Sequence, residues 1–471
     1  MTVKDIDVNA ALDRARAFIG KSKGMSAENK AIMNLLITII TLLMGMLKLN
    51  STNSSLPPSK NKPGTKKKKK KSKGKKRKPG AQKGHLGANL EPVMDPDEVQ
   101  EITIDRRTLP TGEYTHVGFD SRQVFDVKIS TYVTEYRAEI LEDENGNQFV
   151  AEFPKEVKGK TQYGASVKAQ ATYMSLWQLV PLGRVHEFFK SQFNMPVSKG
   201  SVSNFNKKAF ELLEPFEQWA KAQLSYASLL HADETGINVD GKNHWLHCLS
   251  NNQIALFHVD PKRGKEAMDN MDILPHFSGK LVHDHWKPYY RFDCMHCLCN
   301  AHHLRELTWS YEVDEQKWAG KMMDLLGKIN EATNKSGGSL SDKDFQKFLR
   351  KYRSILKQGE KESPPAEKKE GQRGRTKQTK SRNLLERLSE FEEDVLRFAT
   401  DKEIPFTNNA GENDIRMTKV QQKVSGCFRS IQGAKIFCRV RSFLLTCQKQ
   451  GKNPFECLTG LFQGRLPDFI K

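Results

Sequence analysis

Two aspartates stand at the ends of predicted strands near the middle of the chain. Asp233 is the last residue of a mostly apolar run at 226–233, and Asp284 is the last residue of a short strand expected at 280–284. Cleavage of a phosphodiester needs an activated water and a stabilised leaving oxygen, and two divalent ions about 3.5–4 Å apart supply both. Because Mg²⁺ prefers carboxylate oxygens, this pair of residues suits metal-dependent chemistry on a phosphodiester.

The elements between these aspartates predict a sheet that brings them together. Alternating strands are expected at 242–249 and 253–259, followed by a helix at 262–271 and the strand that ends at Asp284. The order strand, strand, strand, helix, strand is that of a ribonuclease H-like fold, an α/β fold in which helices cover a mixed sheet. Residues 226–300 are therefore predicted to be the first part of a catalytic core.

The acidic residues are too many for spacing alone to choose the ligands among them. The chain has 56 Asp and Glu. Glu234 is an alternative to Asp233, and Asp293 is an alternative to Asp284. Most single acidic residues in a protein are loop or capping residues, so a further criterion is needed.

The positive charge of the chain is concentrated in one segment. The formal net charge is +20, and residues 62–83 contain 13 Lys and Arg without an acidic residue, which leaves 63 basic and 56 acidic residues elsewhere. Like charges at this density predict a disordered segment that binds a polyanion in a salt-sensitive way; a solubilising tail is the alternative. We expect DNA contacts from Lys66, Lys67, Lys68, Lys69, Lys70, Lys75, Lys76 and Arg77.

The N-terminal region is predicted to be a helix over 1–50 and a basic disordered linker over 51–90, which is rich in Ser, Pro, Gly and Lys. The apolar run at 31–49 is nearly long enough to span a bilayer. However, its apolar residues repeat with the 3-4-3-4-3 spacing of a coiled coil, at Ile32, Leu35, Ile39, Leu42, Met46 and Leu49. This seam favours a multimerisation helix in a homo-oligomer over a membrane span.

Two further regions precede the core. Residues 91–160 are predicted to be a small strand-rich domain, with strands at 124–129 and 131–140 and a hairpin turn at 144–147. Residues 161–225 are predicted to be helical. Within them, helices at 184–193 and 198–213 have the outline of a helix-turn-helix, which leaves a DNA-binding motif and an ordinary helical hairpin as alternatives.

The cysteines indicate a reducing compartment. All 8 lie between Cys248 and Cys457, which is not the dense pattern of a secreted disulfide scaffold, and no signal peptide is recognised. We expect a cytoplasmic, nucleoid-associated protein.

Several sequence blocks, in a fixed order, resemble the IS66 family of insertion-sequence transposases. Near the N-terminus they are Asn53-Ser-Ser-Leu-Pro-Pro-Ser, the basic run and Lys78-Pro-Gly-Ala-Gln-Lys-Gly-His-Leu-Gly, and Gln162-Tyr-Gly is similar to the start of the family's core. The later blocks are His231-Ala-Asp-Glu-Thr, His283-Asp-His-Trp, Phe406-Thr-Asn-Asn-Ala-Gly-Glu-Asn-Asp-Ile-Arg-Met, Val424-Ser-Gly-Cys-Phe-Arg-Ser and Gly433-Ala.

The resemblance implies a transposase of the DDE type, with Asp233, Asp284 and Glu412 as catalytic and metal-binding residues. Such an enzyme uses two Mg²⁺ (or Mn²⁺) ions to hydrolyse double-stranded DNA at the element's inverted repeats. The freed 3′-hydroxyl then attacks target DNA, without a covalent enzyme intermediate. The resemblance also implies accessory proteins encoded by the same element as partners, and it does not imply an association with a membrane. Some of the basic residues after Glu412 are expected to contact phosphates, and a solvated helix face is the alternative. These residues are Arg416, Lys419, Lys423 and Arg429.

The second and third blocks lie 128 residues apart, from Asp284 to Glu412. A minimal core of this type needs far fewer residues, so 301–383 is predicted to be a helical insertion followed by a loop. Residues 384–471 are then the second part of the core and C-terminal helices. An amphipathic helix is expected at 383–400.

The chain departs from the family pattern in two ways. Relatives have Cys pairs that resemble a zinc finger between the linker and the core, whereas residues 91–160 contain no cysteine and so cannot form a Cys-based zinc site. Asn413 stands where the family usually has Arg after the catalytic Glu.

A run of Cys and His residues follows the second aspartate and has the composition of a metal motif. The alternative is a packing element, because the family has a Cys-x-x-His pair at this position, here Cys299 and His302. The candidate zinc ligands are Cys294, Cys297, Cys299, His302 and His303.

Two other functions are weighed against an active transposase. One is a catalytically silent DNA-binding protein derived from a transposase, which the intact set of three carboxylates disfavours. The other is a ribonuclease H-like nuclease without strand transfer, which the third block and the long insertion disfavour.

Overall fold

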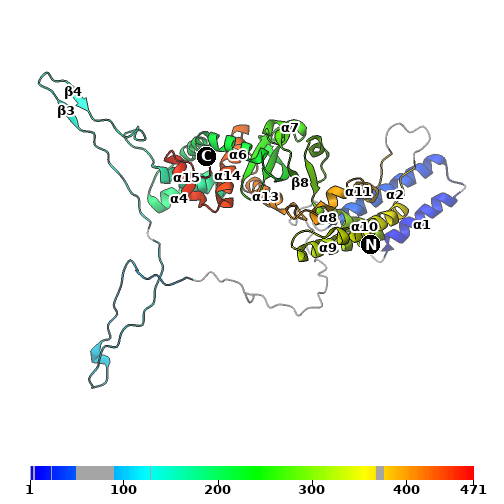
Figure 1. The fold of residues 1–471 in the computed structure, drawn as a ribbon, viewed down its shortest axis with the longest axis horizontal. Helices are drawn as coiled ribbons and strands as arrows, with labels where there is room; N and C mark the ends of the chain where they lie inside the picture. Colours follow the sequence, from blue (N-terminus) through cyan, green and yellow to red (C-terminus); the bar gives the residue numbers. More distant parts are fainter. Residues whose placement is uncertain are drawn as a thin grey trace. The chain divides into compact units, whose positions relative to one another are not determined.

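The computed structural model describes residues 2–3, 6–22, 24–48, 53, 90–127, 129–367 and 376–470 (Figure 1). Its contacts divide the chain into two compact units. One is Gly64–Arg137, and the other comprises Met1–Pro63 and Ala138–Lys471. The basic residues between Lys66 and Arg77 lie outside the described part of the chain.

The centre of the larger unit is a mixed sheet of five strands in the order β7-β6-β5-β8-β9. Its α/β character confirms the predicted fold class at this level. Strands β5, β6 and β7 are antiparallel, whereas β8 and β9 run parallel to β5. The strands are β5 (Leu229–Val239), β6 (Lys242–Ser250), β7 (Ala255–Asp260), β8 (Lys280–His283) and β9 (Met295–Leu298).

The long hairpin of β5 and β6 is set by its turn. Val239 pairs with Lys242, so the loop has two residues, and both have positive φ: 49° at Asp240 and 76° at Gly241. Such turns match the right-handed twist of the strands and favour Asp-Gly. The hairpin fixes the register of β5 and therefore the level of Asp233.

Helices cover the sheet on both faces and along one edge. On one face α6 (Glu214–Ser225) and α7 (Lys265–Met271) bury Phe216 and Met268 against Leu230 and Leu256. On the other face α13 (Asn409–Ser425) buries Ile415 against Ile237.

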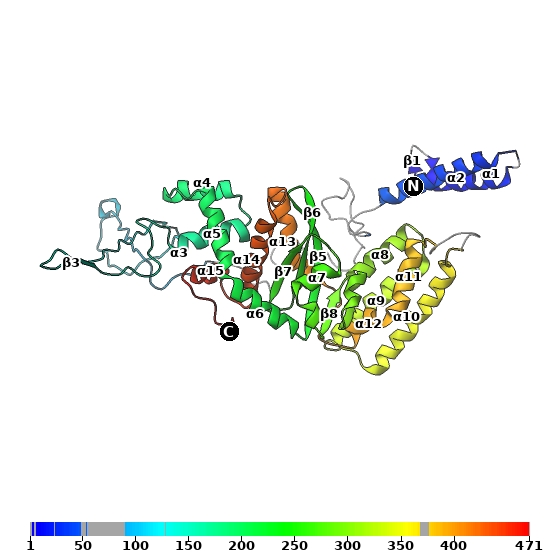
Figure 2. The ribbon, with the colours of Figure 1, turned by 90° about the horizontal axis from the view of Figure 1, so that it is seen from above.

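The helix α14 (Ile431–Lys449) covers the free edge of β7. Ser442 Oγ accepts the N–H of Phe257 at 2.9 Å, and Thr446 Oγ1 accepts that of Ala255 at 3.2 Å. These bonds pair edge groups that would otherwise be open to another strand. Figure 2 shows the sheet between α13 and α14 on one side and the helices that follow β9 on the other.

The segment between Asp284 and Glu412 contains β9 and a helical cluster. Trp318, Leu326, Tyr352 and Leu385 form its buried core with strand residue Val282. The expected helix at 383–400 is divided near Phe391. The helices are α8 (Asn300–Glu312), α9 (Lys317–Lys335), α10 (Asp342–Glu362), α11 (Lys380–Glu390) and α12 (Glu392–Leu396).

Helices α3 (Ala165–Thr172), α4 (Leu182–Phe193) and α5 (Lys199–Leu212) precede the sheet, and α15 (Pro454–Phe462) follows it. The turn between α4 and α5 begins at Asn194, which has a left-handed backbone with φ of 50°, and Ser198 Oγ caps α5 by accepting the N–H of Ser201 at 3.0 Å. The helix-turn-helix outline is thus present as two helices and a turn. A DNA-binding motif and a helical hairpin both remain compatible with it.

The N-terminal region contains two helices, α1 (Val8–Lys21) and α2 (Ala27–Lys48), where a single helix was expected. The break coincides with Gly24 and with Ser26, whose Oγ accepts the N–H of Asn29 at 3.2 Å and caps α2. Ile37 is only 7% exposed, whereas Leu35 is 60% exposed. Among the helices of the described residues, none is long and apolar enough to cross a membrane.

The prediction of strands at 124–129 and 131–140 is wrong for the described residues. The backbone there is irregular up to the short hairpin of β3 (Ile140–Glu142) and β4 (Gln148–Val150). The predicted turn at 144–147 is confirmed, with Gly146 at φ of 79°. Alternation makes a strand only where its apolar face finds a partner, and here Val124 is 92% exposed. The other described element of this region is the 3₁₀ turn η2 (Arg106–Thr108).

Candidate active site

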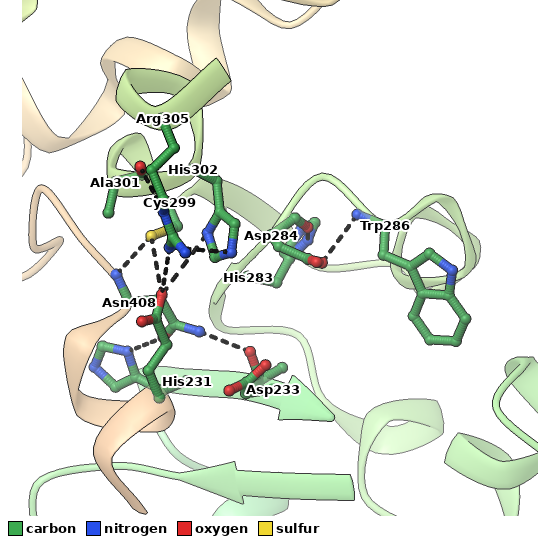
Figure 3. A network of polar contacts seen from close by, with 12 residues as sticks. His231, Asp233, His283, Asp284, Trp286, Cys299, Ala301, His302, Arg305 and Asn408 are labelled. Carbon is green, nitrogen blue, oxygen red and sulfur yellow. Dashed lines mark hydrogen bonds and ion pairs between the residues drawn. The ribbon is translucent and has the colours of Figure 1, made fainter. Parts of the chain in front are cut away.

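Asp233 and Asp284 lie at the same level on neighbouring parallel strands. The register of β5 and β8 pairs His231 with Val282, and each aspartate lies two residues further along its chain. The prediction that Asp233 ends its strand is wrong, because β5 continues to Val239, whereas Asp284 directly follows the last residue of β8 as predicted. Figure 3 shows both side chains. The strand order predicted from the sequence therefore brings these two residues together.

Glu412 lies in the first turn of α13, and a buried asparagine fixes that turn against β5. Asn408 Nδ2 donates to the carbonyl of Ala232 at 2.7 Å, and Asn408 Oδ1 is 2.7 Å from His231 Nδ1. A Cβ at Gly411 would lie 3.3 Å from the Cβ of His231, which is tighter than an ordinary contact, so glycine suits this close approach.

The environment of the two aspartates disfavours their charge. Burial, together with the charges of Glu234, Glu412 and Asp284, raises the pKa of Asp233 to about 8. Burial and the charge of Glu234 raise the pKa of Asp284 to about 6. Within the described part of the chain, no Lys or Arg forms an ion pair with either aspartate. A cation beside these two aspartates would stabilise their ionised forms, since neither has an ion-pair partner of its own among the described residues.

The alternative ligand Glu234 is already satisfied on the opposite face of β5. Arg263 Nη2 donates to Glu234 Oε1 at 2.6 Å, and the Tyr289 hydroxyl donates to Oε2 at 2.6 Å. The Arg263 guanidinium is stacked between the rings of Trp245 and Trp286, 4.6 and 4.2 Å from their centroids. Glu234 is thus held in a packed ion pair.

The other alternative, Asp293, lies at the wrong end of the sheet. The register pairs Lys280 at the start of β8 with Met295 at the start of β9. Asp293 precedes β9 and is exposed, whereas Asp284 follows the end of β8. The two residues therefore lie at opposite ends of neighbouring strands.

Three side chains from the start of α8 lie near the Glu412 carboxylate. Figure 3 labels these three side chains, Cys299, His302 and Arg305, beside one another. Glu412 Oε1 is 3.9 Å from Cys299 Sγ, 3.7 Å from His302 Nδ1 and 3.5 Å from Arg305 Nη2. Cys299 Sγ also accepts the backbone N–H of Asn408 at 3.0 Å. Helix α8 and the start of α13 are thus joined directly at the candidate site.

The five candidate zinc ligands do not converge on one point. Cys297 Sγ is directed to the carbonyl of Met295 at 3.9 Å, and His303 Nδ1 is 3.1 Å from Asn300 Oδ1. Of the five, Cys299 and His302 approach each other, and they do so together with Glu412.

The basic residues after Glu412 differ in their surroundings. Lys419 Nζ donates to the carbonyl of Gly236 at 2.5 Å and so anchors α13 to β5. Arg416, Lys423 and Arg429 are exposed. Arg416 and Lys423 lie four and eleven positions after Glu412, which places them along the same side of the helix.

Sequence reasoning did not identify Asn408 and Arg305, and it left the role of His231 open. Asn408 stands at the N-cap of α13, but its side chain makes no capping hydrogen bond and contacts β5 instead, so the N-cap preference of Asn did not indicate this role. Arg305 had no local signal either, since its contact with Glu412 crosses 107 positions of the sequence.

Comparisons with known proteins agree with this region of the chain. The family model described as Transposase IS66 family matches residues 160–436, which is more than half of the chain. A second model, a family of unknown function (DUF6444), matches residues 14–91. A search of curated proteins gives no match.

Proposed function

The chain belongs to the IS66 family of transposases, and on that premise we propose that it cuts the ends of an insertion sequence and joins the freed 3′-hydroxyl to target DNA. The observation that supports the proposal is that Asp233, Asp284 and Glu412 lie near one another inside the matched segment, close enough for the charges of Glu412 and Asp284 to raise the pKa of Asp233. The catalytically silent alternative gains no support, since all three carboxylates are present.

We propose further that the core is ribonuclease H-like. The order of three antiparallel strands, a helix and a parallel strand supports this assignment, as does the attachment of the helix of Glu412 to the strand of Asp233. The helices α8–α10 and the loop after them are then an insertion between the second and third acidic residues.

Asp233, Asp284 and Glu412 would hold the divalent cations, for which we propose two Mg²⁺ or Mn²⁺ ions. When bound, the ions supply an activated water or hydroxyl and stabilise the leaving oxygen. The protein's own contribution is to hold three carboxylates against their mutual repulsion. Asn408 fixes the turn of Glu412, and Cys299, His302 and Arg305 define the position of its Oε1.

The DNA backbone is proposed to pass along the exposed side of α13. Arg416, Lys423 and Arg429 would contact its phosphates, because their charged groups lie on the protein surface beyond Glu412. Lys419 contributes mainly to the attachment of α13, since its ammonium already has an acceptor. The basic residues from Lys66 to Arg77 would add contacts that carry no sequence information.

We also propose that α2 joins two copies of the chain. Ile37 of α2 is buried, and α2 contacts α1. In contrast, Ile32, Leu35 and Ile39, which belong to the apolar seam with coiled-coil spacing, are exposed. A second copy of the same seam would cover them, as in a coiled coil. Cooperation with accessory proteins of the same element remains an implication of the family.

The proposal is tested by a cleavage assay on DNA that contains the ends flanking the gene, with and without Mg²⁺. Strand breaks at the element ends that require the metal, followed by joined products with target DNA, are expected. A protein that binds these ends in Mg²⁺ but neither cuts nor joins them would support the silent alternative.

A further inference from the structure

Cys299, His302 and Glu412 form a compact group of three chemically different metal-binding side chains. Their ligand atoms lie within 4.8 Å of one another, and the structure places no other such trio among the residues it describes. Glu412 Oε1 is 3.9 Å from Cys299 Sγ and 3.7 Å from His302 Nδ1. The group overlaps the candidate active site through one carboxylate.

These separations are close to those around a tetrahedral zinc ion. Zinc binds thiolate at about 2.3 Å, imidazole at about 2.0–2.1 Å and carboxylate at about 2.0–2.2 Å. Tetrahedral angles then put the sulfur and oxygen ligands about 3.6 Å apart, and the nitrogen and oxygen ligands about 3.4 Å apart. The two distances to Glu412 Oε1 exceed these values by only a few tenths of an ångström, and the ligand atoms of Cys299 and His302 lie within 4.8 Å of each other, so side-chain rotations close the site.

The surroundings of the donor atoms resemble those of a ligand set. His302 Nδ1 is buried without a hydrogen-bond partner in the described structure, although it faces Glu412. Cys299 Sγ accepts the N–H of Asn408 at 3.0 Å, a bond that orients the sulfur and stabilises a thiolate. Both residues lie at the start of α8, so their relative positions are fixed by the helix.

Arg305 is the group that must yield to a metal ion. Its Nη2 is 3.3 Å from His302 Nε2 and 3.5 Å from Glu412 Oε1. When a metal binds Nδ1, the imidazole proton moves to Nε2, and the arginine gives up both contacts. The Cys299 thiol loses its proton to solvent, so one proton is released for each ion bound.

We propose that Cys299, His302 and Glu412 bind one Zn²⁺ or a similarly soft divalent ion, and that this ion inhibits the enzyme by withdrawing Glu412 from the catalytic carboxylates. Three protein ligands leave the fourth tetrahedral position to water. Mg²⁺ does not compete for the sulfur and nitrogen, because it prefers oxygen ligands in octahedral geometry. The inhibition rests on the proposed function, whereas the site itself does not.

The site is tested with the full chain and the metal alone. Zn²⁺ is titrated calorimetrically, and Co²⁺ is used as a spectroscopic substitute whose thiolate charge-transfer band reports a sulfur ligand. We expect one equivalent bound with the band present. Cys299→Ser should remove the band and weaken Zn²⁺ binding by more than about 100-fold, since loss of a supporting contact alone costs about 10–100-fold. Serine keeps an acceptor for the N–H of Asn408.

Cys294→Ser is the matched control, because Cys294 belongs to the same run of Cys and His residues as Cys299 but not to the group of three ligands. This variant should have the Zn²⁺ affinity and the Co²⁺ band of the wild type. A band that is absent from the wild type, or that persists in Cys299→Ser, overturns the site.

Zn²⁺ should also slow Mg²⁺-supported cleavage by the wild type, and a chelator should restore it. If Zn²⁺ binds tightly but does not slow cleavage, the proposal that the bound ion inhibits the enzyme is wrong. The Zn²⁺ titration and the Co²⁺ band are measured without a cleavage assay. The metal site can therefore be confirmed or rejected even if the chain does not cut DNA.

Discussion

His231 and Asn408 are joined by a buried contact of 2.7 Å between Nδ1 and Oδ1, across 177 positions of the sequence. His231 precedes Asp233 on β5, and Asn408 precedes Glu412 at the start of α13. This contact, with the bond from Asn408 to the carbonyl of Ala232, determines where the third carboxylate lies relative to the first.

Asn408→Ala is expected to lower the free energy of unfolding by about 1–3 kcal/mol, because it leaves buried polar groups of His231 and Ala232 unpaired. Cleavage should fall by more than the loss of folded protein explains, since Glu412 is no longer fixed. Chemical denaturation and a cleavage assay at a temperature where the variant is folded measure the two effects. Asn409→Ala, at the exposed neighbouring position, should change neither; equal cleavage by both variants would argue against a positioning role.

Deletion of residues 62–83 is expected to weaken DNA binding and to flatten its dependence on salt. Each phosphate contact that is lost should lower the slope of log K against log [salt] by about 0.9. Affinity measured over a series of salt concentrations tests this. A variant with the same residues in shuffled order should bind as the wild type does, because the effect depends on charge; an unchanged slope after deletion would show that the segment does not contact DNA.

The sequence predicted the sheet better than the contacts that complete the site. Apolar and alternating runs predict β6, β7, β8 and the first half of β5, since a strand pattern is a local property, and the neighbouring positions of Asp233 and Asp284 follow from them. The second half of β5, after Asp233, and the short strand β9 were not predicted. Contacts of Asn408 with His231, and of Arg305 with Glu412, depend on the packing of distant segments, so local patterns carry little information about them. The alternating pattern at 124–140 predicted strands that do not form, because no described surface covers its apolar side chains and a local pattern alone does not make a strand.

The exposed seam of α2 predicts that polar substitutions there change the oligomeric state. Leu35→Glu with Ile39→Glu should lower the molar mass in solution, because charged residues would be buried in the seam. Light scattering after size-exclusion chromatography measures it. Asn34→Glu, an exposed polar position of the same helix, is the control. A double variant with the mass of the wild type would place the contact between copies elsewhere.

Buried histidines predict a loss of stability in mild acid. Burial and the nearby His247 together lower the pKa of His258 to about 4, whereas an unfolded histidine has a pKa of about 6.5. Between these values the unfolded state binds more protons, so the unfolding free energy is complete above about pH 6.5 and decreases as the pH falls towards 4.

His258→Gln should therefore reduce the slope of unfolding free energy against pH between about 6.5 and 4, without abolishing it, because other buried histidines contribute. Urea denaturation at several pH values measures the slope. The exposed residue His276 supplies the control His276→Gln. A slope in His258→Gln that matches the wild type would contradict the attribution to this group.

The assignment of Asp233, Asp284 and Glu412 is tested most directly by the Mg²⁺-dependent rate at which each amide variant cuts DNA carrying the element ends. Asp233→Asn, Asp284→Asn and Glu412→Gln should each bind this DNA as the wild type does and lose cleavage to the background level. Glu234→Gln, which changes the neighbouring carboxylate on the opposite face of β5, should retain cleavage within about tenfold while it is folded. If Glu412→Gln cuts at the wild-type rate, or if Glu234→Gln is the variant that is inactive, the assignment of the three carboxylates is wrong.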